Sequence, residues 1–181
     1  MAMTDDEKRA HWDACYAQVE AVEPEPLPFL TAHADWLPAS GRALDLACGR
    51  GENALFLARR GLETEAWDYA ESAVAGLRER AVGLPLQVQC RDVIAQPPAP
   101  DSFAVIVVAH FLHRPLFPAL AAALRPGGLL FYATWAGAYA GRGPQNMAYR
   151  LGLGELAGAF PGLILLELQE DMDRAAGVWR C

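Results

Sequence analysis

The sequence predicts an α/β fold built on a doubly wound, mostly parallel sheet with a β-hairpin at its C-terminal edge. Short apolar runs alternate with stretches of helical periodicity through most of the 181 residues, which is typical of a parallel sheet covered by helices on both faces. The run 103–109 is continuously apolar, as expected for a central strand buried on both faces. The apolar run 42–46 passes through a glycine turn directly into a helical stretch.

The first 39 residues are expected to be mainly helical. The segment Thr4-Asp5-Asp6-Glu7 is a capping box that opens a helix to about residue 20, and the prolines within 24–28 end this helix. A short second helix is expected over 28–36. We therefore expect residues 1–39 to form a helical lid on a main domain of residues 40–181.

In the main domain, strands are expected over 42–46, 63–67, 86–90, 103–109, 129–135, 163–168 and 177–181, and helices over 53–60, 71–81, 115–124 and 154–160. The stretch 71–81 carries its apolar residues at the three- and four-residue spacing of a half-buried helix. The segment 96–100 contains three prolines, so the covering helix before the fourth strand is missing or reduced to a turn. The last strand is short, which suggests a truncated C-terminus.

Composition and charge favour one compact domain. The chain is 53% hydrophobic, with a formal net charge of −7 and no run of basic residues; a nucleic-acid partner is disfavoured, because such proteins neutralise phosphates with basic surfaces. No apolar run approaches the ~20 residues of a membrane span and no signal segment begins the chain, so we expect a cytoplasmic protein outside the membrane. Reduced thiols and no bound metal are expected, because no zinc-type spacing joins the four cysteines, Cys15, Cys48, Cys90 and Cys181.

The segment 45–54 predicts a nucleotide-like ligand. Gly49 and Gly51 allow a sharp turn and a close approach of the backbone to a ligand, and the next helix begins with unpaired N–H groups. Gly49-x-Gly51-x-x-Ala54 also matches the dinucleotide fingerprint. However, Asp45 at the strand end would repel a pyrophosphate, because like charges at short range in a dry cleft repel strongly. The same carboxylate would hold the ammonium group of S-adenosyl-L-methionine.

Residues 40–135 resemble the class I S-adenosylmethionine-dependent methyltransferases. The first motif of that family, Asp/Glu-x-Gly-x-Gly-x-Gly, reads Asp45-Leu46-Ala47-Cys48-Gly49-Arg50-Gly51 here, with Ala47 in the first glycine position. Asp68 ends the second expected strand, Asp92 follows the third, and Leu124-Arg125-Pro126-Gly127-Gly128 precedes the fifth, in the order of the family. The resemblance implies a Rossmann-like methyltransferase fold.

The implied cofactor site lies at the carboxyl ends of the strands, where ligands bind in such sheets. Asp68, 17 positions after Gly51, is expected to accept the ribose hydroxyls. In the family the acidic residue at the position of Asp92 faces the adenine amino group. Plain turn or capping roles are the alternatives for both acids, and Cys48 is interpreted as a small residue packed beneath the turn. The residues expected to contact S-adenosyl-L-methionine are Asp45, Ala47, Cys48, Gly49, Gly51, Asn53, Asp68, Tyr69, Asp92, Val93 and Ala109.

The implied reaction is an in-line displacement at the sulfonium methyl, which needs no covalent nucleophile from the protein. The loop 110–115 should face this methyl group. There His113 could accept the proton of the acceptor, and Arg114 could hold an anionic acceptor with its planar fork. The alternative is that both side chains only close the loop.

Within this superfamily the chain is most similar to the small tellurite-resistance-type methyltransferases, through residues 113–120, 124–130 and 154–156. That similarity implies a tellurium or selenium oxyanion as one candidate acceptor. The run Asn-Pro-x-Tyr-Leu-Leu-Arg/Lys-Pro-Gly-Glu-Leu of that family has lost its basic residue and both prolines here, and Arg150 lies two positions away. Trp12 and Tyr16 match an aromatic pair that lies over the cofactor in the family.

The predicted function is methyl transfer to a small-molecule acceptor by a monomer or homodimer. Two alternatives stay open. The chain could be an NAD(P)-dependent oxidoreductase that uses the same glycine turn, or a protein that binds S-adenosyl-L-methionine without catalysis.

Overall fold

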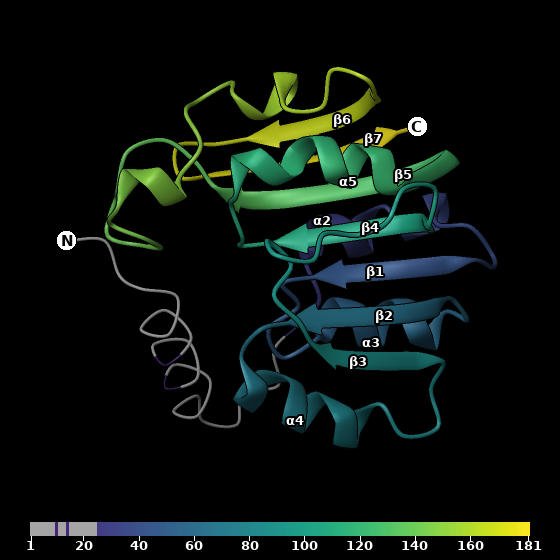
Figure 1. Cartoon of the computed structure of the whole chain (residues 1–181). Coiled ribbons are helices and arrows are strands. Elements are labelled where there is room, and N and C mark those ends of the chain that lie inside the picture. Colours follow the sequence, from purple (N-terminus) through teal and green to yellow (C-terminus); the bar gives the residue numbers. More distant parts are fainter. Residues whose placement is uncertain (1–9, 11–13, 15–24) are drawn as a thin grey trace.

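The computed structural model describes residues 25–181 together with Ala10 and Ala14. The predicted helix up to residue 20, and with it Trp12, Cys15 and Tyr16, lies outside the described residues. The chain from residue 25 onward forms an open sheet with helices packed on it (Figure 1).

The sheet has seven strands in the order β3-β2-β1-β4-β5-β7-β6. Their bounds are β1 Arg42–Leu46, β2 Glu63–Asp68, β3 Leu86–Cys90, β4 Phe103–Ala109, β5 Leu124–Trp135, β6 Ile164–Glu170 and β7 Arg174–Arg180. The first five strands are parallel, whereas β7 runs antiparallel to both β5 and β6. The strand order reverses between β1 and β4, so a ligand crevice is expected beyond the carboxyl ends of these two strands. The predicted fold class, including the C-terminal hairpin, is confirmed.

The helices are short because turn residues interrupt them. The α-helices are α2 Pro28–Ala32, α3 Glu52–Arg59, α4 Glu71–Arg80 and α5 Phe117–Ala123, and the 3-10 turns are η1 Ala34–Trp36, η2 Arg114–Leu116, η3 Met147–Tyr149 and η4 Leu156–Gly158. No helix forms within 91–102, as the prolines of this segment predict. Among the described residues, none of the helices has the length and apolar character needed to cross a bilayer.

Two sequence predictions near the C-terminus are wrong. The helix expected over 154–160 is reduced to the single turn η4, because Gly154, Gly158 and the following Pro161 disfavour a continuous helix. The last strand begins at Arg174 and pairs with β5 over seven positions, so it is not the short strand that was expected. Small residues at its start, which have low strand propensity, concealed its true length.

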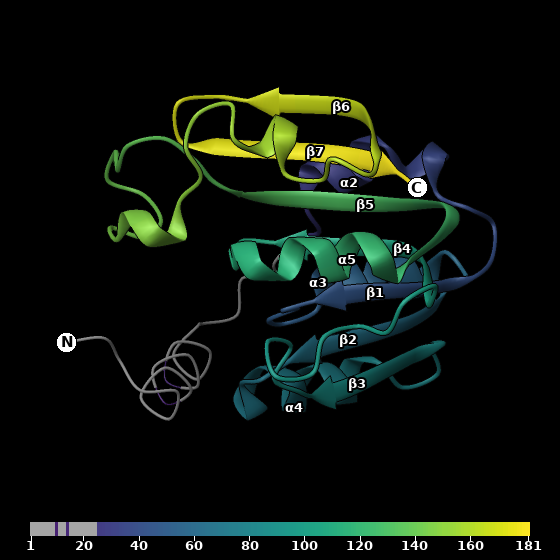
Figure 2. The same ribbon diagram turned by 45° about the horizontal axis from the view of Figure 1, so that its top comes forward.

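Apolar side chains pack on both faces of the sheet. Phe29, Leu30 and Leu57, from α2 and α3, pack behind the sheet against β4 and β5, while Leu120 of α5 packs in front of it (Figure 2). The front also carries an aromatic group, Phe117, Tyr132, Phe160 and Trp179, whose neighbouring rings lie 4.9–5.7 Å apart. These two layers hold the carboxyl ends of the parallel strands along one edge.

Candidate cofactor site and acceptor side

The chain reverses sharply where β1 meets α3. Ala47, Gly49 and Gly51 all have left-handed backbones, with φ values of 55°, 54° and 80°. At Gly51 a side chain is also sterically excluded, because a Cβ there would lie 2.2 Å from a Cδ atom of Leu77 in α4. Ala47 occupies a conformation that normally favours glycine, which matches its place in the first glycine position of the motif. The turn places the N-terminus of α3 beside the end of β1.

Asp45 lies beneath this turn and is 1% exposed. Its Oδ2 accepts a hydrogen bond from the Ala54 N–H at 2.9 Å, whereas its Oδ1 is buried and has no hydrogen-bond partner among the described residues. Burial raises the pKa of Asp45 well above its ordinary value and the nearby charges of Glu52 and Asp68 add to this, whereas the Ala54 N–H and the Asn53 side chain act in the opposite direction. A buried acceptor without a partner is costly, so this oxygen is suited to a ligand that brings a donor or a positive charge.

Asp68 links the glycine turn to the end of β2. Its Oδ2 accepts from the Gly49 N–H at 2.8 Å, and its Oδ1 accepts from the Ala70 N–H at 3.0 Å. The side chain is 5% exposed, and Tyr69 follows it, half-buried, at the same edge. The turn role considered for Asp68 is therefore real, and a carboxylate has enough lone pairs to serve a ligand as well.

Asp92 and Val93 lie next along this edge, after β3. The Oδ1 of Asp92 accepts from the N–H groups of Ile94 and Ala95, at 2.9 and 3.1 Å. Val93 is buried in the front core. Asp92 thus stabilises the turn that replaces a covering helix. Ala109, at the end of β4, is half-buried at the same edge.

Asn53 and Cys48 serve the packing of the turn. The Oδ1 of Asn53 accepts from the Leu27 N–H at 2.8 Å, so this side chain attaches the segment before α2 to the start of α3. Cys48 is 8% exposed, and burial, followed by the charges of Asp45 and Asp68, raises the pKa of its thiol well above the ordinary value. A protonated, buried thiol is a poor nucleophile, which supports the interpretation of Cys48 as a small packing residue.

The methyl acceptor is expected beside the loop 110–115, which we call the acceptor side. There, Arg114 is already paired within the protein. Its Nε and Nη2 donate to the two carboxylate oxygens of Glu155, at 2.5 and 2.8 Å. It also donates to the carbonyls of Ala148 and Arg150, at 3.3 and 3.0 Å. The guanidinium group that was expected to hold an anionic acceptor thus binds groups of the segment 148–155 instead. His113 precedes η2 and is half-buried.

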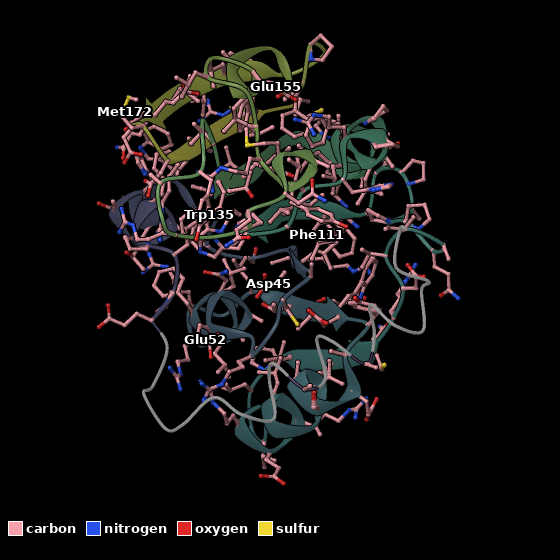
Figure 3. All side chains as sticks on the ribbon, turned by 90° about the vertical axis from the view of Figure 1, so that its left-hand side faces the viewer. Asp45, Glu52, Phe111, Trp135, Glu155 and Met172 are labelled. Atoms are coloured by element: carbon pink, nitrogen blue, oxygen red, sulfur yellow. The ribbon has the colours of Figure 1, made fainter. Side chains whose placement is uncertain are left out.

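His110, from the loop that was expected to face the methyl group, meets two residues that were not predicted, Trp135 and Arg174, at the same edge. Trp135 ends β5, the Arg174 guanidinium carbon lies 4.4 Å from its ring centroid, and the His110 ring lies 5.9 Å from it. His110 has a φ of 59°, and such strain in a residue other than glycine is often found at functional sites. Partial burial and the charge of Arg174 lower the pKa of His110. Viewed from the carboxyl ends of the strands, Trp135 and Phe111 lie on either side of the space above Asp45 (Figure 3).

Comparisons with known proteins identify the family. Residues 43–128 match the family described as a methyltransferase domain, and solved structures of the same fold include S-adenosylmethionine-dependent methyltransferases. The chain therefore carries a methyltransferase domain over these residues. A ubiquinone biosynthesis O-methyltransferase from Idiomarina loihiensis is 32% identical over 132 residues, which cover 67% of this chain and 53% of that protein. The chain thus spans about half the length of this curated relative.

Two solved structures show the same fold as this methyltransferase domain. TehB from Haemophilus influenzae is 19% identical with a TM-score of 0.75, and the match covers 96% of this chain and 67% of that one. The [4+2]-cyclase SpnF is 15% identical with a TM-score of 0.78, over 99% of this chain and 97% of that one. Because a cyclase shares the fold, the fold alone does not determine the reaction.

The residues at the carboxyl ends of the strands fit S-adenosyl-L-methionine as a ligand. The unpartnered Oδ1 of Asp45 suits the ammonium of S-adenosyl-L-methionine, and a pyrophosphate there would meet a carboxylate instead of a donor. The left-handed turn at Gly49 and Gly51 keeps side chains away from the same space.

Arg150 is not available to an oxyanion. It is 1% exposed and has no carboxylate partner among the described residues. Its guanidinium donates to the carbonyls of Ala136, Gly137, Ala138, Arg142, Pro144 and Asp173, at 2.7–3.5 Å. The idea that Arg150 replaces the missing basic residue of the tellurite-resistance-type run is therefore not supported, because this cation holds the loop after β5 together.

Proposed function

We propose that this protein transfers the methyl group of S-adenosyl-L-methionine to a small, anionic acceptor. The observation that carries the proposal is the buried Asp45 carboxylate, with one oxygen unpartnered, at the point of the sheet where the strand order reverses. A cofactor that carries a positive charge would pair with the unsatisfied oxygen and offset the free-energy cost of burying the negative charge of Asp45. A dinucleotide would place two phosphates at this position, so the oxidoreductase alternative is disfavoured.

The cofactor-binding roles follow from the order of residues along the edge. Asp45 would hold the ammonium group, Asp68 the ribose hydroxyls and Asp92 the adenine amino group, with Val93 and Tyr69 beside the adenosine. Backbone groups of the turn would contact the methionine part, with Ala109 close by. When bound, the cofactor supplies the activated methyl group and its leaving group. The protein supplies orientation and excludes water.

The acceptor side combines a cation, an aromatic ring and a base. Arg174 projects its charge over Trp135 and forms no ion pair with any residue in the described part of the chain, so it is suited to hold an anionic acceptor. His110 and His113 are the candidate proton acceptors. The lowered pKa of His110 keeps its imidazole neutral, and so able to take a proton, near pH 7. Arg114 would act on this side by positioning the segment 148–155.

A tellurite- or selenite-like oxyanion is one member of this acceptor class. The similarity of the sequence to tellurite-resistance-type methyltransferases and the fold shared with TehB support it. Two observations weigh against an oxyanion acceptor: Arg114 is hydrogen-bonded to Glu155, and Arg150 is hydrogen-bonded to backbone carbonyls. Neither of these two cations is then available to bind it. Small aromatic carboxylates fit the pairing of Arg174 with Trp135 equally well. Oligomeric state and cytoplasmic location stay predictions.

A binding and turnover experiment tests the function. Calorimetry should show that S-adenosyl-L-methionine and S-adenosylhomocysteine bind, whereas NAD and NADP do not. Asp45→Asn should weaken binding of S-adenosyl-L-methionine by about ten- to a hundredfold, as for a lost charge-assisted pair. Transfer of a labelled methyl group is then measured with selenite, tellurite and small aromatic carboxylates. Binding of NAD in place of S-adenosyl-L-methionine would overturn the assignment, and tight cofactor binding without transfer to any acceptor would favour the non-catalytic alternative.

A further inference from the structure

A hollow lies at the amino ends of the parallel strands, opposite the cofactor site. It has a volume of about 450 Å³, within the usual range for small-molecule sites. It is lined by Trp36, Pro38, Ala104, Arg125, Pro126, Gly127, Gly128, Leu129 and Arg180. Ala104 and Ala109 lie near opposite ends of β4, roughly 16 Å apart at the usual rise of a strand, so an occupant of this hollow would not reach the cofactor site at the carboxyl ends of the strands.

The lining of this hollow is positively charged in an acidic protein. The chain carries a net charge of −7, yet both charged side chains of the lining are arginines. One carboxylate group lies beside the hollow, because Cys181, the last residue, accepts the Gly127 N–H with its main-chain oxygen at 2.9 Å. The guanidinium of Arg125 donates only to the backbone carbonyl of Asp101, at 3.2 Å. The side chain of Arg180, which lies at the end of β7, has no hydrogen bond or ion pair in the part of the chain that the structure describes. Both guanidinium groups can therefore still bind an anion.

The hollow also has an aromatic side chain on one side, that of Trp36, and open space beside Gly127. Trp36 is 40% exposed, and its indole packs against the His33 ring at a centroid distance of 4.6 Å. Gly127 has a φ of 79°, and a Cβ at this position would meet nothing within 4 Å. A flat ligand could thus lie against Trp36 with its charged end toward the arginines.

We propose that this hollow binds a small planar anion, an aromatic ring that carries a carboxylate. Arginine forks pair with carboxylates through two parallel hydrogen bonds, and the indole of Trp36 offers a stacking surface for the ring. The site is separate from the acceptor side, and it does not depend on the proposed methyl transfer.

Nuclear magnetic resonance on the full chain tests this site, with benzoate as the probe and benzamide as its uncharged counterpart. Benzoate should shift the indole N–H of Trp36 and the amides of Gly127 and Gly128 in a saturable way, and benzamide should not. Arg180→Gln and Arg125→Gln should each weaken the apparent affinity at least tenfold, as expected for a lost charge-assisted hydrogen bond. Arg59→Gln, which removes the same charge from the exposed end of α3, is the matched control and should change nothing.

The contribution of the aromatic ring of the ligand is tested with acetate, which carries the carboxylate without the ring. Benzoate should bind more tightly than acetate, and Trp36→Leu should remove this difference. Shifts near Trp135 would report benzoate on the acceptor side, and Arg174→Gln should abolish those shifts without affecting the ones at Gly127. Equal shifts with benzamide, no shift at Trp36 and Gly127, or no effect of either arginine substitution in the hollow would overturn the proposal.

Discussion

The Gly49 N–H donates to the carboxylate of Asp68, at 2.8 Å, across the gap between β1 and β2. The acid that is proposed to hold the ribose therefore also holds the glycine turn in place. Cofactor affinity and stability are linked at this residue, and substitutions there must be measured for both.

We expect Asp68→Ala to weaken binding of S-adenosyl-L-methionine by about ten- to a hundredfold and to destabilise the fold by roughly 1–3 kcal/mol, because the Gly49 and Ala70 amides lose their buried acceptor. Calorimetry and urea unfolding measure the two effects. Asp68→Asn keeps one oxygen for these amides and should recover more stability than affinity. Unchanged cofactor affinity in Asp68→Ala would remove this residue from the ribose site.

Ala47 has a φ of 55°, and an alanine in this conformation costs about 1–2 kcal/mol relative to the right-handed region. Glycine avoids this cost but loses more chain entropy on folding. We expect Ala47→Gly to stabilise the fold by about 1 kcal/mol, measured by denaturant unfolding, with cofactor affinity retained. The control, Ala58→Gly within α3, should destabilise by at least about 1 kcal/mol. Destabilisation by Ala47→Gly would show that the alanine Cβ contributes more than its strain costs.

Substitutions in the pair Arg114–Glu155 can distinguish a positioning role of Arg114 from direct contact with the acceptor. If Arg114 acts by holding the segment 148–155, Arg114→Gln and Glu155→Gln should lower methyl transfer to the same extent and speed hydrogen exchange in this segment. Both variants should leave affinity for S-adenosyl-L-methionine within about a factor of three, since a threefold change is below 1 kcal/mol. Loss of transfer in Arg114→Gln alone would instead indicate contact with the acceptor.

His33 connects α2 to β6, because its Nδ1 lies 2.7 Å from the Phe29 carbonyl oxygen and its Nε2 lies 2.8 Å from a carboxylate oxygen of Glu167. Burial lowers the pKa of His33, but the hydrogen bonds to Phe29 and Glu167 outweigh it, so the pKa is raised above 6.5. The protonated imidazole donates to both partners, whereas the neutral ring can donate to only one. The Glu167 pKa is lowered below 4.5, mainly by its hydrogen bond with His33.

A raised pKa in the folded state means that the contribution of His33 to stability is complete below pH 6.5 and is lost as the pH rises through the folded pKa. The contribution of Glu167 is present above pH 4.5 and is lost as the pH falls through its folded pKa. We therefore expect the pair to stabilise most between these limits, measured as the free energy of unfolding against pH. His33→Gln should remove the decline above pH 6.5. A decline that persists in this variant would assign it to another group.

The sequence by itself determined the strands β1 to β4, the glycine turn and the placement of acids at the strand ends, because these features depend on residues close together in the chain. The apolar run of β4, the left-handed positions at Gly49 and Gly51, and the placement of Asp45 and Asp68 at strand ends all follow from local periodicity and backbone freedom. The family resemblance depends on the same local motifs.

Only the tertiary structure decided which side chains meet on the acceptor side. Arg174 reaches Trp135 because β7 pairs antiparallel with β5 in the register that aligns these two residues, and register depends on packing of whole strands. Arg114 is bound by Glu155, 41 positions away, and Arg150 by carbonyls up to 23 positions away. A charged side chain that is buried on folding pairs with the polar groups that the fold places near it. The spacing of residues in the sequence does not predict which groups these are.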